Sequence, residues 1–301
     1  MPTMQNFEGK IAVVTGGASG MGRELVRQLA ADGCHVALCD LSVEEMEETR
    51  QLALADAPSG TRVTTHRCDV SDEASWLAFR DAVVAEHATD HVNLLFNNAG
   101  IGGGGSVITD PREVWERTFN VCWGGVYLGV RTFLPLLIAA DEGHIVNTSS
   151  VNGFWASIGP DRPHTAYSAA KFAVKGFSEA LITDLRVNAP HVKVSVVMPG
   201  HIGTSIVANS VRHGGMELDM ESAELMKMAS DMFRDNAPTT AAEASAEILA
   251  GVREERWRLL IGDDARVLDA AVRANPEGAY DGVSLGDLTS EGGPLGQLSA
   301  D

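Results

Sequence analysis

The chain has 301 residues, of which 41 are acidic and 23 are basic, so its formal net charge at pH 7 is −18. Such a surface repels phosphates and anionic lipid headgroups, and we therefore expect neither nucleic acid nor a membrane as a partner. The length suits one large α/β domain or two small ones. The N-terminus has no basic region followed by an apolar run, so we expect no signal peptide and a cytoplasmic protein.

The cysteines and histidines do not follow a metal-binding pattern. The four cysteines show no CxxC pairing and fall in or beside predicted elements, which favours buried, reduced thiols over disulfides. The nearest approach to a metal pair is His87 and His91, which have no third ligand nearby. We expect no metal site.

Residues 10–31 have the order strand, glycine-rich turn, helix. Ile11 to Val14 is a short apolar run, and helical spacing of apolar residues begins after Gly22. This arrangement places a phosphate at a helix N-terminus. Gly16 permits the sharp turn, Gly20 lets the backbone approach a pyrophosphate, and Gly22 lets the helix pack closely on the strand. The stretch therefore predicts a dinucleotide site.

Strands and helices alternate along the rest of the chain. Further strands are predicted at 34–40, 62–66, 92–96, 144–148, 192–198 and 257–261, and further helices at 42–55, 71–87, 111–139, 166–187 and 239–253. The pattern is typical of a doubly wound, parallel α/β sheet with right-handed crossovers. No repeat or linker interrupts it, so we expect a single domain over residues 1–301.

Two segments stand outside this alternation. Residues 201–238 are predicted to form a helical insertion, and five of the ten methionines fall there, at Met216, Met220, Met226, Met228 and Met232. They predict either an apolar, mobile lid over a substrate or an ordinary amphipathic helix pair. The glycine-rich, acidic tail at 276–301 is expected to be disordered unless a neighbouring subunit holds it.

Asp40 ends the second predicted strand, where ligands of doubly wound sheets bind. A carboxylate there would accept hydrogen bonds from a ribose diol and would repel a 2′-phosphate. Leu41 adds no positive charge. The sequence therefore favours NAD over NADP as cofactor, although a polar strand end is the simpler alternative.

Tyr167 and Lys171 lie four residues apart on a predicted helix and so share one face. A free phenol is a poor base at pH 7, and a nearby ammonium lowers its pKa. Removal of a hydride from an alcohol carbon needs a base for the hydroxyl proton. The pair therefore predicts a tyrosine general acid/base, whereas an isolated pair at this spacing is more often a surface feature.

Together these motifs resemble the short-chain dehydrogenase/reductase family from about Phe7 to Thr204, and more weakly to about Gly262. The matching segments are Thr15-Gly16-Gly17-Ala18-Ser19-Gly20-Met21-Gly22, Asn97-Asn98-Ala99-Gly100, Asn120, Ser149-Ser150, Tyr167-Ser168-Ala169-Ala170-Lys171 and Pro199-Gly200-His201-Ile202-Gly203-Thr204. The resemblance implies a seven-stranded Rossmann sheet in the order 3-2-1-4-5-6-7. It also implies an NAD-dependent oxidoreductase.

The resemblance assigns roles to individual residues. Tyr167 would be the general acid/base, Lys171 would bind the nicotinamide ribose, Ser150 would hold the substrate oxygen, and Asn120 would complete a proton relay. The residues expected to bind the cofactor are Gly16, Ser19, Gly20, Met21, Gly22, Asp40, Leu41, Asp69, Val70, Asn98, Ala99, Gly100, Tyr167, Lys171, Pro199, Gly200, Ile202 and Thr204.

One departure from the family pattern lies between Ser150 and Tyr167. The interval is longer than the pattern leads us to expect, with the surplus at Ile158 to Thr165. It leaves Ser149 as the alternative to Ser150 and adds a loop on the substrate side. With Phe154 and Trp155 close by, we expect a mainly apolar pocket for a hydrophobic secondary alcohol or its ketone.

The sequence features also bear on two alternative functions and on the oligomeric state. A non-catalytic NAD-binding sensor or scaffold would be expected to lack Ser150, Tyr167 or Lys171, and all three are present. An epimerase or dehydratase is disfavoured by the form of the glycine motif. The apolar helices at 111–139 and 166–187 predict a homo-oligomer, and the family resemblance implies a dimer or tetramer built on these helices.

Overall fold

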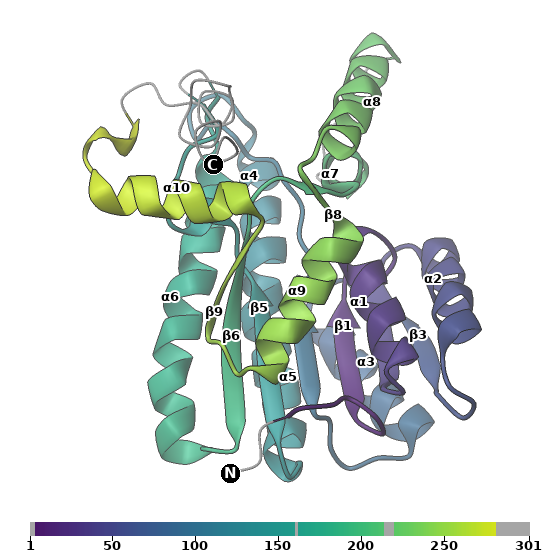
Figure 1. The fold of residues 1–301 in the computed structure, drawn as a ribbon. Helices are drawn as coiled ribbons and strands as arrows, with labels where there is room; N and C mark the ends of the chain where they lie inside the picture. The colour runs from purple at the N-terminus through teal and green to yellow at the C-terminus, as the bar shows by residue number, and fades with distance from the viewer. Residues whose placement is uncertain (1–3, 160–161, 214–219, 281–301) are drawn as a thin grey trace, which may run out of the picture.

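The protein is built on a parallel sheet of seven strands. The computed structural model describes residues 4–159, 162–213 and 220–280 (Figure 1). The strand order is β3-β2-β1-β4-β5-β6-β9, which confirms the predicted Rossmann order. The strands are β1 (Ile11–Thr15), β2 (His35–Asp40), β3 (Val63–Arg67), β4 (Leu94–Asn97), β5 (Gly143–Thr148), β6 (Val192–Pro199) and β9 (Arg258–Ile261).

Helices cover both faces of the sheet, which explains why the inner strands, such as β1 and β4, are apolar along most of their length. One core contains Leu25 and Ile248, from α1 (Gly20–Ala31) and α9 (Ala241–Arg253). The core on the other face contains Trp76, Phe133 and Leu181. These residues come from α3 (Glu73–His87), α5 (Gly125–Ala139) and α6 (Thr165–Asn188). The remaining helix beside the sheet is α2 (Val43–Asp56).

The segment predicted as one helix over 111–139 consists of two helices. α4 (Arg112–Phe119) and α5 are joined by a π-helical turn over Asn120–Gly124, in which the Gly125 N–H donates to the Asn120 carbonyl. The combined span of 28 residues is long and apolar enough to cross a membrane by length and composition, but half of its most apolar window is buried inside the protein. It is therefore read as a core helix pair.

The predicted insertion at 201–238 contains two helices and two short strands. β7 (Ile202–Gly203) and β8 (Thr239–Thr240) pair in parallel and frame α7 (Ile206–His213) and α8 (Met220–Asp235). Figure 1 shows α8 projecting away from the body of the protein. Sequence analysis did not predict α10 (Asp263–Ala274), which lies across the carboxyl end of the sheet in Figure 1.

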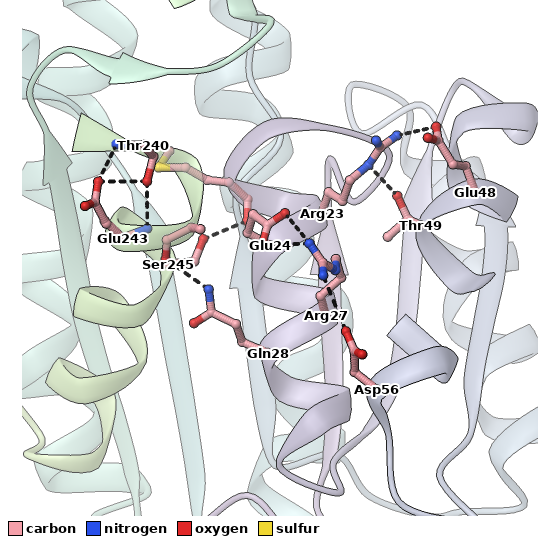
Figure 2. A network of polar contacts seen from close by, with 12 residues as sticks. Arg23, Glu24, Arg27, Gln28, Glu48, Thr49, Asp56, Thr240, Glu243 and Ser245 are labelled. Atoms are coloured by element: carbon pink, nitrogen blue, oxygen red, sulfur yellow. Dashed lines mark hydrogen bonds and ion pairs between the residues drawn. The ribbon is translucent and has the colours of Figure 1, made fainter. Parts of the chain in front are cut away.

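A network of polar contacts holds α1 against its neighbours (Figure 2). Arg23 donates to the Ala18 carbonyl at 2.7 Å and to Glu48 and Thr49 of α2. On the other side of α1, Ser245 of α9 donates to the carbonyl of Met21 at 3.1 Å. The glycine turn is therefore fixed from both flanking helices.

The described part of the acidic tail reaches the body of the protein. The indole N–H of Trp155 donates to the Ala279 carbonyl at 2.8 Å, and the Tyr280 hydroxyl accepts from the Ala156 N–H at 3.1 Å. These contacts attach the chain after α10 to the loop that follows β5. Residues 281–301, where most of the predicted tail falls, lie outside the described residues.

Candidate active site

The glycine turn after β1 forms one wall of a cavity at the carboxyl ends of the strands. Gly16 has φ of +66°, a conformation that L side chains rarely adopt. A Cβ atom on Gly22 would lie 1.9 Å from the Gly16 carbonyl oxygen, so only glycine permits this packing. The Thr15 hydroxyl accepts from the backbone N–H groups of Asn98 and Ala99 at 3.0 Å each. This contact ties the turn to the end of β4.

Asp40 lines the same cavity from the end of β2. Its carboxylate accepts hydrogen bonds from the backbone N–H groups of Ala18 at 3.2 Å and Leu41 at 2.7 Å. The side chain is therefore oriented by main-chain donors on two sides. A carboxylate held in this way can accept hydrogen bonds from a sugar diol.

Asp69 lines the cavity from the segment after β3. Burial opposes its ionisation, but hydrogen bonds from Ser71 and the nearby Arg117 guanidinium hold its pKa below the ordinary value. Arg117 of α4 also lines the cavity, and its Nη1 lies 3.3 Å from Asp69 Oδ2. The positive charge at this wall is therefore already paired with a carboxylate.

Most of the predicted cofactor residues line this first cavity. Those that do are Gly16, Ser19, Gly20, Met21, Asp40, Leu41, Asp69, Val70, Asn98, Ala99, Gly100 and Thr204. Tyr167, Lys171, Pro199, Gly200 and Ile202 line an adjoining second cavity instead, which has a volume of about 920 Å³. Gly22 lines neither, because its role is close packing beneath the turn. Met21, Asn98, Gly100, Thr204 and Ile206 line both cavities, so the two adjoin.

Ser150, Tyr167 and Lys171 meet in the second cavity. The hydroxyl of Tyr167 forms a hydrogen bond with the Ser150 side chain. Lys171 is 2% exposed, and its Nζ donates to the Thr148 carbonyl at 2.9 Å and lies 5.3 Å from the centre of the Tyr167 ring. Ser149, the sequence alternative to Ser150, donates instead to the main-chain carbonyl of Lys171 at 2.7 Å. The geometry thus pairs Ser150, not Ser149, with the phenol.

The protonation of Tyr167 differs from the sequence expectation. Burial raises its pKa well above the ordinary value, and the hydrogen bond with Ser150 opposes this only in part. Burial also lowers the pKa of Lys171. Removal from water therefore opposes the expected lowering of the phenol pKa by a nearby ammonium, and that lowering stays a prediction. Tyr167 is held here as a proton donor.

Asn120 is not brought to this group. Its side chain is exposed and lines neither cavity. Cys122, two residues later, is fully buried in a cluster with Tyr167 and Ala170. Cys122 is buried because it lies on the same helix face as the buried Val126, which is four residues later in the chain. The assignment of Asn120 to the site is thus contradicted by its position.

Two residues at the site, His164 and Asn209, were not predicted from the sequence. The His164 ring lies 4.8 Å from the Tyr167 ring, centroid to centroid, and burial lowers the pKa of His164 to about 4, so it is neutral at pH 7. Asn209 of α7 donates to the Ser19 hydroxyl at 3.1 Å and places α7 over the first cavity. His164 falls in the surplus loop at Ile158 to Thr165, and the extra length of this loop was the one sequence feature that could have indicated its role.

The expectations for the substrate pocket are only partly met. Trp155 is buried against α10 rather than in the cavity, and Phe154 packs in the same cluster. Met228 and Met232 are exposed and line neither cavity. The side chains of Met216 and Met220 lie outside the described residues. The apolar wall comes instead from other residues, namely Val151, Ile158, Ile202, Ile206, Val207, Phe233 and Pro238.

Comparison with known families decides the classification. The sequence model of the family described as short chain dehydrogenase matches residues 10–214. The chain belongs to the short-chain dehydrogenase/reductase family. The matched region contains the glycine turn, Asp40, Ser150 and the Tyr167–Lys171 pair.

Individual relatives in this family cover nearly the whole chain. A protein named SadH from Mycobacterium tuberculosis is 38% identical over 271 residues, which is 90% of this chain and 92% of the relative. Levodione reductase from Leifsonia aquatica is 31% identical over 271 residues, which is 88% of this chain and 92% of that enzyme.

Solved structures of the family carry both forms of the cofactor. A short-chain dehydrogenase/reductase from Burkholderia phymatum in complex with NAD has a TM-score of 0.76 and 28% identity, covering 89% of this chain and 96% of that one. A metagenomic short-chain oxidoreductase in complex with NADP has a TM-score of 0.61 and 28% identity, covering 85% and 97%. Short-chain dehydrogenases/reductases use a nicotinamide cofactor, and the glycine cradle of this chain, where a Cβ on Gly22 would collide with Gly16, fits a pyrophosphate.

Proposed function

We propose that this protein is an NAD-dependent oxidoreductase that interconverts a secondary alcohol and its ketone, with Tyr167 as general acid/base. The observation that carries the proposal is the meeting of Ser150, Tyr167 and Lys171 in a cavity that adjoins the glycine-turn cavity. A nicotinamide cofactor bound in the first cavity would supply or accept the hydride. The substrate carbon would then lie between this cofactor and the Tyr167 hydroxyl.

Ser150, Tyr167 and Lys171 would each have a separate role in the reaction. The Ser150 hydroxyl, hydrogen-bonded to Tyr167, would orient the substrate oxygen. Tyr167 would donate its proton to that oxygen during ketone reduction and accept it back during alcohol oxidation. Lys171, held by the Thr148 carbonyl, would stabilise the negative charge that develops on the phenol oxygen.

The charges around the first cavity favour NAD over NADP. Asp40 lies at the end of β2, where a 2′-phosphate would meet a carboxylate. Arg117, which lines this cavity, is paired with Asp69. The pKa of His213 is lowered, first by burial and then by Arg212, so its ring is neutral at pH 7. Among the described residues, these three side chains provide no unpaired positive charge for the 2′-phosphate of NADP.

The walls of the second cavity support a substrate with an apolar body. Its apolar side chains include Ile206 and Val207 of α7 and Phe233 of α8. Polar side chains such as Asn152 also line the cavity, but its apolar wall favours a ligand with an apolar body, whose carbonyl or hydroxyl faces Ser150 and Tyr167. Levodione reductase, a relative by sequence, bears the name of a ketone reductase.

The exposed aromatic rings of α5 and α6 support a homo-oligomer, either a dimer or a tetramer. Tyr127 is 43% exposed and Phe172 is 42% exposed. The Trp123, Tyr127 and Phe177 rings form one cluster, with centroids 5.3 to 6.3 Å apart. Burial of such a patch against a second copy would remove apolar surface from water. We also propose that the enzyme is cytoplasmic, consistent with its reduced cysteines.

Replacement of Tyr167 by Phe tests the proposal. The variant keeps the ring but lacks the proton, so turnover of ketones and alcohols should fall at least about a hundredfold. NAD binding, measured by calorimetry, should stay close to that of the wild type. Full activity of the variant would overturn the assignment. A wild-type protein that binds NAD and turns over no alcohol or ketone would favour a non-catalytic sensor.

A further inference from the structure

The Cys122 thiol lies close to the Lys171 ammonium, where it can influence the charge of the lysine. A Cβ atom built on Gly100 would lie 3.5 Å from Lys171 Nζ and 3.7 Å from Cys122 Sγ. The ammonium and the sulfur therefore flank the same glycine. Cys122 lines neither cavity, so any effect on the reaction would pass through its neighbours.

The Cys122 side chain is held in a defined orientation. It is 0% exposed, and its Sγ donates to the Ile101 carbonyl at 3.1 Å. With the proton directed at Ile101, the sulfur lone pairs are free to face the cluster that contains Tyr167. The π-helical turn over Asn120–Gly124 gives the helix this rotation and leaves Asn120 in solvent.

Within the described residues, few other groups stabilise the charge of Lys171. Its Nζ donates to one main-chain carbonyl, that of Thr148, although an ammonium has three donors. The buried site lowers the pKa of Lys171, and Cys122 acts in the opposite direction. Cys122 also adds to the burial that raises the pKa of Tyr167. A sulfur lone pair that faces Lys171 would thus favour a charged lysine and a protonated tyrosine.

We propose that Cys122 is the positioning residue behind Lys171, and that its thiol, rather than the carboxamide of Asn120, keeps the Lys171 ammonium charged beside Tyr167. The role rests on the proposed function, because it serves the proton transfer by Tyr167. This chain would therefore use the Cys122 thiol beside Lys171, whereas the family resemblance implies a relay through Asn120.

Four variants test this proposal. Cys122→Ala removes the sulfur, and Cys122→Ser keeps a donor for Ile101 and lone pairs for Lys171. Asn120→Ala tests the competing residue. The matched control is Cys34→Ala, which removes another buried thiol that donates to a main-chain carbonyl, that of Lys10, away from both cavities.

The first readout is the pH profile of ketone reduction. In Cys122→Ala, kcat should fall about tenfold, and the alkaline limb should move to lower pH by roughly half a unit or more. NAD affinity and the KM for the ketone should change little. Cys122→Ser should recover most of the loss, while Asn120→Ala and Cys34→Ala should keep the wild-type profile.

The second readout does not depend on turnover. The Nζ resonance of isotope-labelled Lys171, identified by its loss in Lys171→Met, reports the charge of the lysine in NMR spectra. The pH at the midpoint of the Lys171 titration should fall in Cys122→Ala and stay unchanged in Asn120→Ala. A shift in Asn120→Ala, or an unchanged midpoint in folded Cys122→Ala, would overturn the proposal. If the midpoint shifts but the wild type reduces no ketone, the proposed function fails alone.

Discussion

The Asp40 carboxylate and the Ala18 backbone N–H are hydrogen-bonded at 3.2 Å, so the end of β2 and the glycine turn orient each other. This contact brings a negative charge to the wall of the first cavity. A second bond, from the Leu41 N–H at 2.7 Å, fixes the other carboxylate oxygen. The cofactor preference of the enzyme should therefore depend on the charge of Asp40 rather than on its shape.

Asp40→Asn separates charge from shape, since the amide oxygen can still accept from Ala18. Removal of the charge should raise the ratio of kcat/KM with NADP to that with NAD by at least about tenfold, because the 2′-phosphate no longer meets a carboxylate. Asp56→Ala is the control, since Asp56 lies on α2 away from both cavities. An unchanged ratio in Asp40→Asn, measured in steady-state assays, would contradict the role given to the charge.

Arg23 should stabilise the cofactor site more than its neighbour Arg27. Arg23 bonds to the Ala18 carbonyl and to Thr49, which is fully buried, whereas Arg27 makes ion pairs with Glu24 and Asp56 at the surface (Figure 2). Arg23→Ala should lower the free energy of unfolding by about 1–3 kcal/mol and weaken NAD binding. Arg27→Ala should cost under about 1 kcal/mol.

Chemical denaturation and NAD titration measure both effects. Because both arginines lie on α1, the pair of variants controls for helix propensity. Equal losses in the two variants would show that the bond to the glycine turn contributes nothing beyond a surface ion pair.

The parts of the fold that could be predicted are those in which a local pattern and a buried face coincide. β1 and α1 are an example, since the apolar run, the glycines and the helical spacing all lie within 22 residues. α10 escaped prediction because its apolar residues contact the loop after β5, far away in sequence. Trp155 was misplaced for the same reason: its partner is Ala279.

The position of Cys122 shows why part of the site could not be predicted. A motif gives a residue type and an approximate place, whereas the face of a helix depends on how its turns are wound. The π-helical turn after Phe119 changes that winding, so the exposed residue is Asn120 and the buried one is Cys122. Ser150, Tyr167 and Lys171, in contrast, lie on a strand end and a regular helix, where spacing alone determines direction.

The stability of the protein should fall as the pH is lowered below about 6.5, and His144 should contribute to the fall. His144 is 1% exposed, and its Nε2 lies 2.7 Å from the Ser195 hydroxyl. Burial lowers its pKa to about 3, with a smaller effect of Lys193 in the same direction. Between pH 6.5 and this value the unfolded chain binds a proton that the folded chain does not, so each unit of acidification costs up to about 1.4 kcal/mol.

His144→Gln removes the titrating group, so the free energy of unfolding should depend less steeply on pH between 6.5 and 4. Denaturant titrations at several pH values measure the slope. His91→Gln replaces a partly exposed imidazole and controls for the loss of a histidine in general. A wild-type slope in His144→Gln would show that other groups, such as the buried His87, account for the acid sensitivity.

The exposed rings of α5 and α6 should hold subunits together. Phe172→Glu places a carboxylate on the exposed surface of α6, the helix that also carries Phe177 of the aromatic cluster, and a charge buried there against a second copy would lack a partner. The variant should dissociate to smaller species in light scattering while keeping its fold by circular dichroism. Val43→Glu is the control, since Val43 is 58% exposed on α2, on the opposite face of the sheet from α6. A monomeric wild type would refute the proposed assembly, whereas an oligomer that survives Phe172→Glu but not Val43→Glu would place the interface on α2.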